Sequence, residues 1–223
     1  MTKVHPFWEQ PEQVEKFAAR EADKRLLKLI SRYPHPEETR VLDLGCAGGR
    51  NTEVLAKRKF DVYAVDASLP MVEKTRERVA AILGPEETEK RVRPGTMEDL
   101  QDFPENSFHL VVALGIYHNA QDQRQWDEAV QQTVRILTPG GQLLIANFSP
   151  KSAPNGRKLQ PVPDKPHVYE GFSSGPLFLL EANEMDVEMA HHGLFPIVAT
   201  ETVKVLTEQG HRITVNALYR KQA

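Results

Sequence analysis

Two acidic residues in the first third of the chain stand where predicted strands end. Asp43 lies within the apolar run 41–44, and Asp66 closes the apolar run 62–65. A glycine-rich stretch, 45–49, follows the first run, and glycine permits the backbone angles of a sharp turn. A carboxylate at the end of the second strand can accept hydrogen bonds from both hydroxyls of a ribose. The spacing therefore predicts a strand–helix–strand unit with a small-molecule pocket at its carboxyl edge.

The arrangement of the glycines argues against a dinucleotide as the small molecule. A dinucleotide turn has the pattern G-x-G-x-x-G, which places the pyrophosphate on a helix N-terminus. Anchored at Gly45, that pattern requires glycine where Ala47 and Arg50 stand. The turn instead suits a ligand with an uncharged linker and an amino-acid end.

Several motifs in order resemble the class I S-adenosylmethionine (SAM)-dependent methyltransferases. They are VLDLGCAGGRNT, VYAVDAS, GTMEDL, FHLVVALGIYHN and LTPGGQLLIANF, and they run from about Arg40 to Phe148. The resemblance implies SAM as cofactor, S-adenosylhomocysteine (SAH) as product, and a seven-stranded sheet with a reversed last strand. The GRNT variant and the final GHRITVNALYRK are similar to small-molecule members that methylate thiols or metalloid oxyanions.

The resemblance also implies which residues bind the cofactor. Asp43 helps to fix the glycine turn and the cofactor ammonium, while Asp66 binds the ribose. The family places an acid where Thr96 stands, so Glu98 or Asp99 is expected to substitute as the acceptor for the adenine amino group. The full predicted set is Asp43, Gly45, Cys46, Ala47, Gly48, Asp66, Ala67, Thr96, Met97, Glu98 and Leu114.

The loop after the predicted strand 108–114 faces the methyl acceptor in the family. Tyr117 and His118 are therefore the candidate catalytic residues, and a histidine can remove a proton at neutral pH. An equally weighted alternative is that His118 is a packed histidine with backbone partners. Cys46 is expected to be a small buried thiol rather than a nucleophile.

The N-terminal residues offer two further possibilities. The aromatic segment 5–8 either closes over the active site or holds the first helix on the core. Arg20, within residues 17–21, could meet the cofactor carboxylate, although solvation at the surface is the favoured interpretation. The histidines show no metal-binding spacing, so no metal is expected.

The composition is that of a single α/β domain. The chain has 223 residues, of which 40% are hydrophobic and 26% charged, with a net charge of −3. The chain has no excess of basic residues, so its charge does not favour a nucleic-acid partner. Cys46 is the only cysteine, which excludes an intrachain disulfide. No apolar run is long enough for a membrane span, and residues 1–6 lack a signal core, so a cytoplasmic location is expected.

Hydrophobic periodicity predicts alternating strands and helices. One or two helices are expected before residue 34, and the end of the chain is expected to form a β-hairpin. The predicted helices are 49–57, 69–83, about 126–137 and 177–192, and the predicted strands are 61–66, 91–93, 108–114, 142–148, 197–206 and 213–219. This order predicts a Rossmann-like three-layer sandwich with a seven-stranded, mostly parallel sheet whose last strand is antiparallel.

The proline-rich segment 149–176 has little periodicity. Long irregular segments in compact domains are usually functional loops or disorder. A lid over the substrate and a surface excursion without chemistry are equally weighted. The expected plan is one domain, 1–223, with an N-terminal helical cap (1–36), a SAM-binding core (37–148), the proline-rich segment (149–176) and a C-terminal helix and hairpin (177–223).

The predicted function is methyl transfer by in-line displacement to a small molecule. The acceptor atom is a thiol, a metalloid oxyanion, or an oxygen or nitrogen nucleophile. The alternatives are a protein or RNA methyltransferase and a catalytically silent SAM-binding module. No nucleic-acid or membrane partner is expected, and the sequence does not predict the oligomeric state.

Overall fold

The computed structural model describes residues 5–222. Residues 1–4 and 223, at the two ends of the expected domain, lie outside the described residues. The helices are η1 (Pro6–Glu9), α1 (Pro11–Ala18), α2 (Lys24–Ile30), η2 (Pro36–Glu38), α3 (Arg50–Lys57), α4 (Leu69–Leu83), α5 (Pro85–Arg91), η3 (Tyr117–Asn119), α6 (Gln123–Ile136) and α7 (Ala182–His191). The strands are β1 (Arg40–Leu44), β2 (Asp61–Asp66), β3 (Val92–Pro94), β4 (Phe108–Leu114), β5 (Leu137–Phe148), β6 (Gln160–Pro161), β7 (Val168–Phe172), β8 (Gly175–Phe178), β9 (Leu194–Pro196), β10 (Glu201–Thr207) and β11 (Gly210–Lys221).

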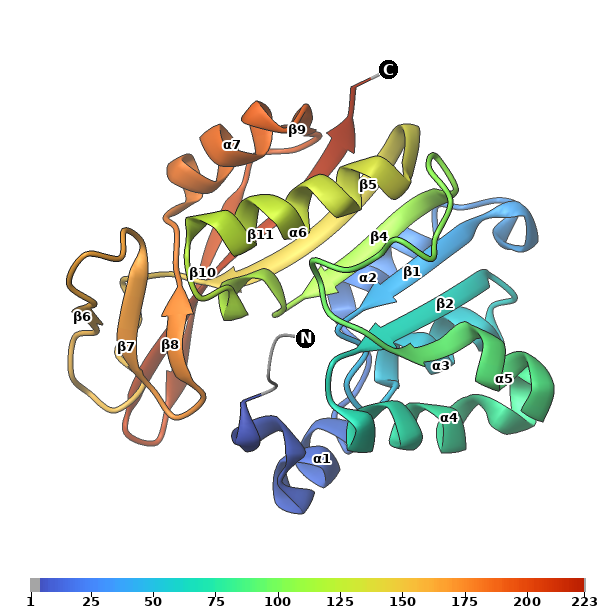
Figure 1. Ribbon diagram of the computed structural model, residues 1–223, viewed down its shortest axis with the longest axis horizontal. Coiled ribbons are helices and arrows are strands. Elements are labelled where there is room, and N and C mark those ends of the chain that lie inside the picture. The colour runs from blue at the N-terminus through green and yellow to red at the C-terminus, as the bar shows by residue number, and fades with distance from the viewer. Residues whose placement is uncertain (1–4, 223) are drawn as a thin grey trace.

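The main sheet has the strand order β10-β11-β5-β4-β1-β2-β3 (Figure 1). Strands β1 to β5 pair in parallel, whereas β11 is antiparallel to both of its neighbours, β5 and β10. The short strand β9 pairs with the end of β11 and β10 pairs with its beginning, so the two form one interrupted edge strand. The sheet therefore has seven positions, and the predicted fold class is confirmed.

Helices cover both faces of this sheet. Apolar side chains of α2 and α3, such as Leu26 and Leu55, pack with Val41 and Leu110 on one face. On the opposite face lie α6 and α7 (Figure 1). Trp126 of α6 and Met185 of α7 are buried in one apolar cluster with residues of β4 and β5 such as Val111 and Ile145. Strand β4 is buried along most of its length, as a strand covered on both faces must be.

Some predicted boundaries were wrong. No helix was predicted between residue 83 and the strand expected at 91–93, but Pro85 begins α5 because proline fits the first position of a helix. The helix predicted from Leu177 begins only at Ala182, where Glu181 and Glu184 form a capping box. Before it, residues 175–178 form β8.

The proline-rich segment was expected to be irregular, and this expectation was wrong. Residues 160–178 contain the small antiparallel sheet β6-β7-β8. Its strands are too short to produce a periodic pattern. Leu159, Leu177 and Leu179 form their own apolar cluster beneath it, and Phe148 and Phe172 pack against that cluster.

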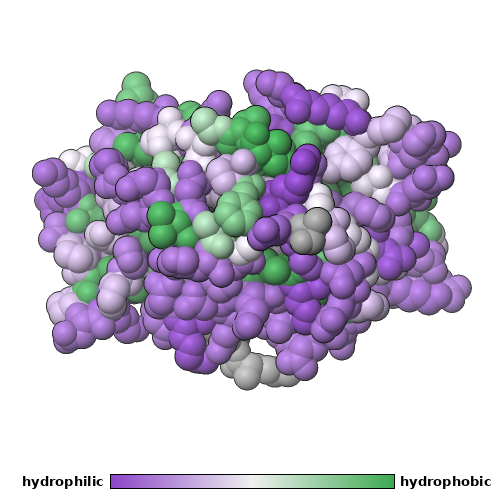
Figure 2. Space-filling model, turned by 90° about the horizontal axis from the view of Figure 1, so that it is seen from above, coloured by the Kyte–Doolittle hydropathy of each residue, from purple (hydrophilic) through white to green (hydrophobic). Residues whose placement is uncertain are grey.

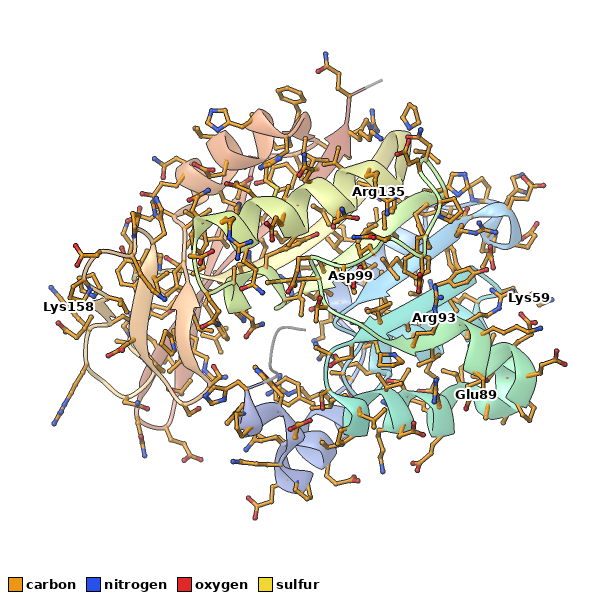
Figure 3. All side chains as sticks on the ribbon, viewed as in Figure 1. Lys59, Glu89, Arg93, Asp99, Arg135 and Lys158 are labelled. Atoms are coloured by element: carbon orange, nitrogen blue, oxygen red, sulfur yellow. The ribbon has the colours of Figure 1, made fainter. Side chains whose placement is uncertain are left out.

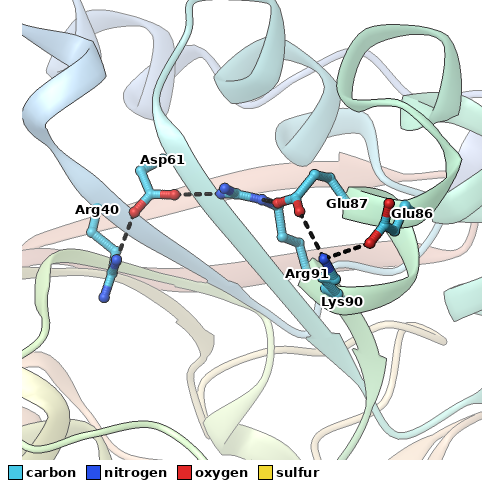
Figure 4. A network of polar contacts seen from close by, with 6 residues as sticks. All are labelled: Arg40, Asp61, Glu86, Glu87, Lys90 and Arg91. Atoms are coloured by element: carbon cyan, nitrogen blue, oxygen red, sulfur yellow. Dashed lines mark hydrogen bonds and ion pairs between the residues drawn. The ribbon is translucent and has the colours of Figure 1, made fainter.

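A network of ion pairs ties together the amino ends of β1 and β2 (Figure 4). Asp61 accepts hydrogen bonds from Arg40 Nε at 2.7 Å and from Arg91. Arg91 also donates to Glu87 at 2.8 Å, and Lys90 bonds Glu87 at 3.3 Å. The network links α5 to the sheet, so the helix that the sequence did not predict is fixed by charges rather than by a long apolar face.

The outer surface is mostly polar. The face in Figure 2 is predominantly hydrophilic, and its hydrophobic residues gather in small, separate patches. Among residues 5–222, no helix is both long enough and apolar enough to cross a membrane.

Candidate active site

A cavity of about 410 Å³ lies at the carboxyl ends of β1, β2 and β4. Its walls come from the N-terminal segment, the glycine turn, the loops after β2, β3 and β4, and the β7–β8 hairpin. The residues that line it are His5, Pro6, Trp8, Phe17, Asp43, Gly45, Cys46, Ala47, Arg50, Asn51, Asp66, Ala67, Ser68, Met71, Thr96, Met97, Glu98, Leu114, Gly115, Ile116, Asn119, Gln121, Gln125, Ser174 and Pro176. Ten of the eleven residues predicted to bind the cofactor are in this set.

Asp66 holds the glycine turn in place. One carboxylate oxygen accepts the Ala47 amide at 2.8 Å, and the other accepts the Ser68 amide at 2.9 Å. Each oxygen has a second lone pair, so the carboxylate can accept further hydrogen bonds from a ligand. Burial raises the pKa of Asp66, and the backbone donors oppose this shift. The residue therefore has both a structural role and capacity for a ligand.

The turn needs its first glycine for a packing reason. Gly45 has φ +74°, and a Cβ atom there would lie 2.8 Å from Ile116 Cδ1. Ala47 also adopts the left-handed region, with φ +48°. An alanine in that region is strained by about 1 kcal/mol or more, and such strain is often found at ligand sites.

Asp43 is almost completely buried at the end of β1. It accepts a hydrogen bond from Thr52 Oγ1 at 2.6 Å, which joins β1 to α3. Burial raises the pKa of Asp43 to about 6, against the opposing effects of Thr52 and Arg50. Asp43 therefore fixes the start of α3 and presents a polarisable carboxyl group to the cavity.

Two members of the turn have roles in packing. Cys46 is buried with its sulfur 3.5 Å from Thr75 Oγ1, and burial followed by the charges of Asp66 and Asp43 raises its pKa. It is therefore a neutral thiol. Gly48, which was predicted to bind the cofactor, is not among the residues that line the cavity. A Cβ atom there would lie 2.6 Å from Ala18 Cα, so its hydrogen allows α1 to approach the turn.

The loop after β3 forms the wall opposite the turn. Thr96, Met97 and Glu98 line the cavity, and Glu98 accepts a hydrogen bond from Gln125 Nε2 at 3.0 Å. Asp99, the other substitute acceptor considered, is exposed and outside the cavity lining; its side chain is labelled in Figure 3. Glu98 is thus the acid that this loop offers to a ligand.

The structure does not bring Tyr117 and His118 into the cavity. The Tyr117 hydroxyl is buried in a 2.6 Å hydrogen bond with Thr133 Oγ1, and burial raises its pKa. His118 Nδ1 accepts the Phe148 amide at 3.2 Å, and its ring stacks on Phe148 at 4.7 Å. Burial lowers the pKa of His118 to about 3. This geometry gives no support to the predicted general base, because the imidazole is a neutral packing group.

Several cavity residues were not predicted. Asn51 was within reach of sequence reasoning because it follows the glycine turn at the start of α3. Gln121 and Gln125 come from α6 and the loop before it, and Ser174 and Pro176 come from the β7–β8 hairpin. These positions carry no local motif, since long-range packing alone brings them to the cavity. The described residues contain no cluster of three or more potential metal ligands.

The N-terminal segment 5–8 reaches the cavity, as one of its two predicted roles required. Trp8 packs edge-on against Phe17, with ring centroids 5.3 Å apart, and its carbonyl accepts the Ser68 hydroxyl at 3.0 Å. A Cβ atom at Gly175 would lie 3.2 Å from His5 Nε2. The segment and the β7–β8 hairpin therefore meet above the cavity.

Comparison with known proteins agrees with this geometry. Residues 41–141 match the family model described as "Methyltransferase domain". The ubiquinone biosynthesis O-methyltransferase of Caulobacter sp. (strain K31) is 31% identical over 113 residues, which are 51% of this chain and 42% of that protein. The trans-aconitate 2-methyltransferase of Variovorax paradoxus is 30% identical over 141 residues, covering 60% of this chain and 48% of that protein. The chain thus spans less than half the length of these two curated relatives.

A solved structure extends the similarity to the whole fold. The PH0226 protein from Pyrococcus horikoshii OT3 superposes with a TM-score of 0.68 over 98% of this chain and 97% of that one, at 16% identity. The family match falls on β1 to β5, the part of the sheet that carries the glycine turn and Asp66. Together these findings support a relationship between the chain and the class I SAM-dependent methyltransferases, with the sequence similarity lying in residues 41–141 and the similarity in fold covering nearly the whole chain.

Proposed function

We propose that the cavity binds SAM and that the chain transfers its methyl group, by in-line displacement, to a small-molecule acceptor. The acceptor atom is a thiol, a metalloid oxyanion, or an oxygen or nitrogen nucleophile. The observation that carries the proposal is the position of Asp66, which lines the cavity while it holds the Ala47 amide. One carboxylate thus holds the glycine turn and can accept hydrogen bonds from the ribose of SAM.

The other cavity residues suit the remaining parts of SAM. Met97 offers an apolar contact for the adenine ring, and Glu98 offers an acceptor for its amino group. Asn51 and Arg50, at the start of α3, suit the amino-acid end, where the guanidinium favours a carboxylate. Asp43 favours the ammonium, directly or through water.

When bound, SAM supplies a methyl group on a positively charged sulfur. The charge disappears as the methyl moves, so alignment of the acceptor and exclusion of water are the main tasks of the protein. Trp8, Phe17 and Ile116 supply apolar wall for this purpose. The proposal assigns no proton transfer to His118, because its ring is buried against Phe148 and its pKa is lowered to about 3. An acceptor that is already ionised fits this site best.

A small acceptor is supported by the way the cavity is covered. His5 and Pro6 on one side and Ser174 and Pro176 on the other line the same cavity. One named relative is a trans-aconitate 2-methyltransferase, and trans-aconitate is a small organic compound; another is an O-methyltransferase of ubiquinone biosynthesis. In this proposal the small sheet β6–β8 serves as part of the acceptor wall.

Titration calorimetry tests the cofactor assignment. SAH should bind, and NADH should not bind comparably. Asp66→Ala should weaken SAH binding at least tenfold, because a charge-assisted hydrogen bond contributes about 1.5–3 kcal/mol. Asp99→Ala, an exposed neighbour outside the lining, is the matched control and should leave the affinity unchanged. Binding of NADH without SAH, or an unchanged affinity of Asp66→Ala, contradicts the assignment.

A substrate panel tests the acceptor class. SAH release should follow addition of small thiols, phenols, carboxylates or oxyanions. Methylation of only RNA or protein would overturn the small-molecule proposal. No methylation of any acceptor, together with tight SAH binding, would favour the silent SAM-binding module.

A further inference from the structure

Three arginines gather beside the cavity at the carboxyl edge of the sheet. Arg20 follows α1, Arg50 begins α3, and Arg212 lies near the start of β11. Arg50 donates to the Glu21 carbonyl at 3.1 Å, which joins the start of α3 to the loop after α1. Burial, and then the charges of Arg50 and Arg212, lower the pKa of Arg20. Segments that are distant in sequence thus bring like charges together.

These guanidinium groups have no carboxylate partner. Within the described residues, no Asp or Glu oxygen lies within 4.0 Å of Arg20, Arg50 or Arg212. Their neighbour Arg25 differs, since it forms a 2.6 Å ion pair with Asp23. In addition, Arg212 Nε is buried and has no hydrogen-bond partner among residues 5–222. A buried donor without a partner is unfavourable, and so is the convergence of like charges. Both features are relieved by a bound anion.

Aromatic rings lie beside the arginines. The Arg20 guanidinium is 4.0 Å from the centroid of Phe17, and that of Arg212 is 5.7 Å from the centroid of Phe148. Phe148 in turn stacks on Phe172 of the small sheet at 4.8 Å. The surroundings therefore combine a cationic group with apolar faces, which suits a small organic acid better than an inorganic ion.

The location separates this cluster from the nucleoside part of the cofactor. Asp66 and Met97 lie on the β2 and β3 side of the cavity, whereas Phe148 ends β5 and Arg212 lies on β11, across β1 and β4. Phe17 and Arg50 line the cavity itself. Because Arg50 already suits the amino-acid end of SAM, Arg20 and Arg212 remain for a second anionic group.

We propose that Arg20 and Arg212, beside Arg50, bind the carboxylate of the methyl acceptor, which makes the acceptor a small organic acid. This inference rests on the proposed function. The planar guanidinium matches a carboxylate through two parallel hydrogen bonds, and Arg212 Nε supplies one donor that the protein leaves free. The acid group would then anchor the acceptor while its nucleophilic atom reaches the cavity.

The test compares acids with neutral analogues of the same shape. Benzoate and succinate, and separately benzamide and succinamide, are titrated into the protein with and without saturating SAH. The acids should bind in both conditions and the amides should not. Arg20→Gln and Arg212→Gln should each weaken acid binding about tenfold or more and leave SAH affinity within about twofold. Arg212→Lys, which keeps the charge but loses the planar fork, should be intermediate.

The controls separate the possible failures. Arg124→Gln, on the exposed side of α6, removes a guanidinium 76% exposed in its side chain and should change neither affinity. Thermal melts identify variants that do not fold, and Arg212→Lys then takes the place of Arg212→Gln. Acids that bind no better than amides, or that bind the variants equally well, overturn the inference. Acids that compete with SAH also overturn it, because the arginines then serve the cofactor carboxylate. Failure of SAH itself to bind contradicts the proposed function, while the titration without SAH still decides the anion site.

Discussion

The two ends of the main sheet use arginine in opposite ways. At the amino end, Arg40 and Arg91 flank Asp61, and Glu87 completes the network (Figure 4). At the carboxyl end, Arg20, Arg50 and Arg212 converge with no carboxylate within ion-pair distance among the described residues. Guanidinium groups that pair with carboxylates stabilise the fold, whereas we propose that those without a carboxylate partner are available to a ligand. The comparison separates residues that maintain the structure from residues that we propose to bind other molecules.

The largest effect is expected at the amino end. Asp61→Asn removes the charge between Arg40 and Arg91 and should lower the free energy of unfolding by about 2–3 kcal/mol, with SAH affinity unchanged. Asp102→Asn is the control: Asp102 is 84% exposed and 3.5 Å from Arg93, so the change should be below about 0.5 kcal/mol. Chemical denaturation measures both. If Asp61→Asn is as stable as the wild type, the arginines at the amino end do not stabilise the fold and the proposed difference between the two ends is wrong.

The pH dependence should also differ between the two ends. His118, at the carboxyl end, has a folded pKa of about 3 against an ordinary value of 6.5, so only the unfolded chain takes up its proton as the pH falls. Its contribution is present above pH 6.5, and about 2 kcal/mol should be lost by pH 5. Asp43 opposes this loss, because its raised pKa makes protonation favour the folded state between about pH 6 and 3.8.

A comparison of the wild type with His118→Asn isolates the histidine, since both proteins keep Asp43. The stability difference between them should shrink by about 2 kcal/mol from pH 7 to pH 5. At the amino end, burial is outweighed by the hydrogen bonds and charges of Arg40 and Arg91, which lower the pKa of Asp61. Stability from Asp61 is therefore present above its unfolded value of 3.8 and is lost only below it. If the stability difference between the wild type and His118→Asn does not depend on pH, His118 is not buried as described. If His118→Asn shows unimpaired turnover, His118 has no catalytic role.

A smaller effect is expected from two residues with positive φ, one at each end of the main sheet. Ala47 (φ +48°) lies in the glycine turn, and Lys59 (φ +66°) lies in the exposed turn before β2. Replacement of either residue by glycine removes backbone strain from the folded state but increases the conformational entropy of the unfolded chain. Because these two terms oppose each other, the free energy of unfolding should change by less than about 1 kcal/mol. Only Ala47→Gly should weaken SAH binding: glycine keeps the amide that Asp66 accepts, but it makes the turn that lines the cavity more flexible. Equal effects on binding would contradict the functional difference between the ends.

The smallest effect is the most direct test of the comparison. Arg20→Gln removes a like charge near Arg50 and Arg212 but also a contact with the Phe17 ring, two terms of opposite sign and similar size. The free energy of unfolding should therefore change by about 0.5 kcal/mol or less. If Arg20→Gln destabilises the protein as much as Asp61→Asn does, its guanidinium has a structural partner and the distinction between the two ends is wrong.

Sequence reasoning worked best where local signals suffice. The bounds of β2, α4 and β4 were predicted without error, because an apolar run or a helical repeat ends at a clear turn signal in each case. Ten of the predicted cofactor residues reach the cavity since the glycine turn, the end of β2 and the loop after β3 meet at one sheet edge. Whether they bind SAM stays a prediction that the titrations test.

Long-range contacts explain what the sequence could not reveal. The side-chain direction of His118 depends on Phe148, thirty positions away, whose ring offers a stacking surface in the core. The approach of Arg20 to Arg212 depends on the whole sheet being assembled. The small sheet β6–β8 likewise gains its stability from packing beneath it rather than from its own pattern.

The position of β11 has a consequence for synthesis of the protein. This strand pairs with β5 from Gln142 to Phe148, yet residues 149–209 are made before it. During translation, the outer edge of β5 therefore presents unpaired backbone groups on a strongly apolar strand. A nascent chain that stalls before β11 leaves the ribosome has a template for pairing with other chains, which makes it a substrate for chaperones or a seed for aggregation.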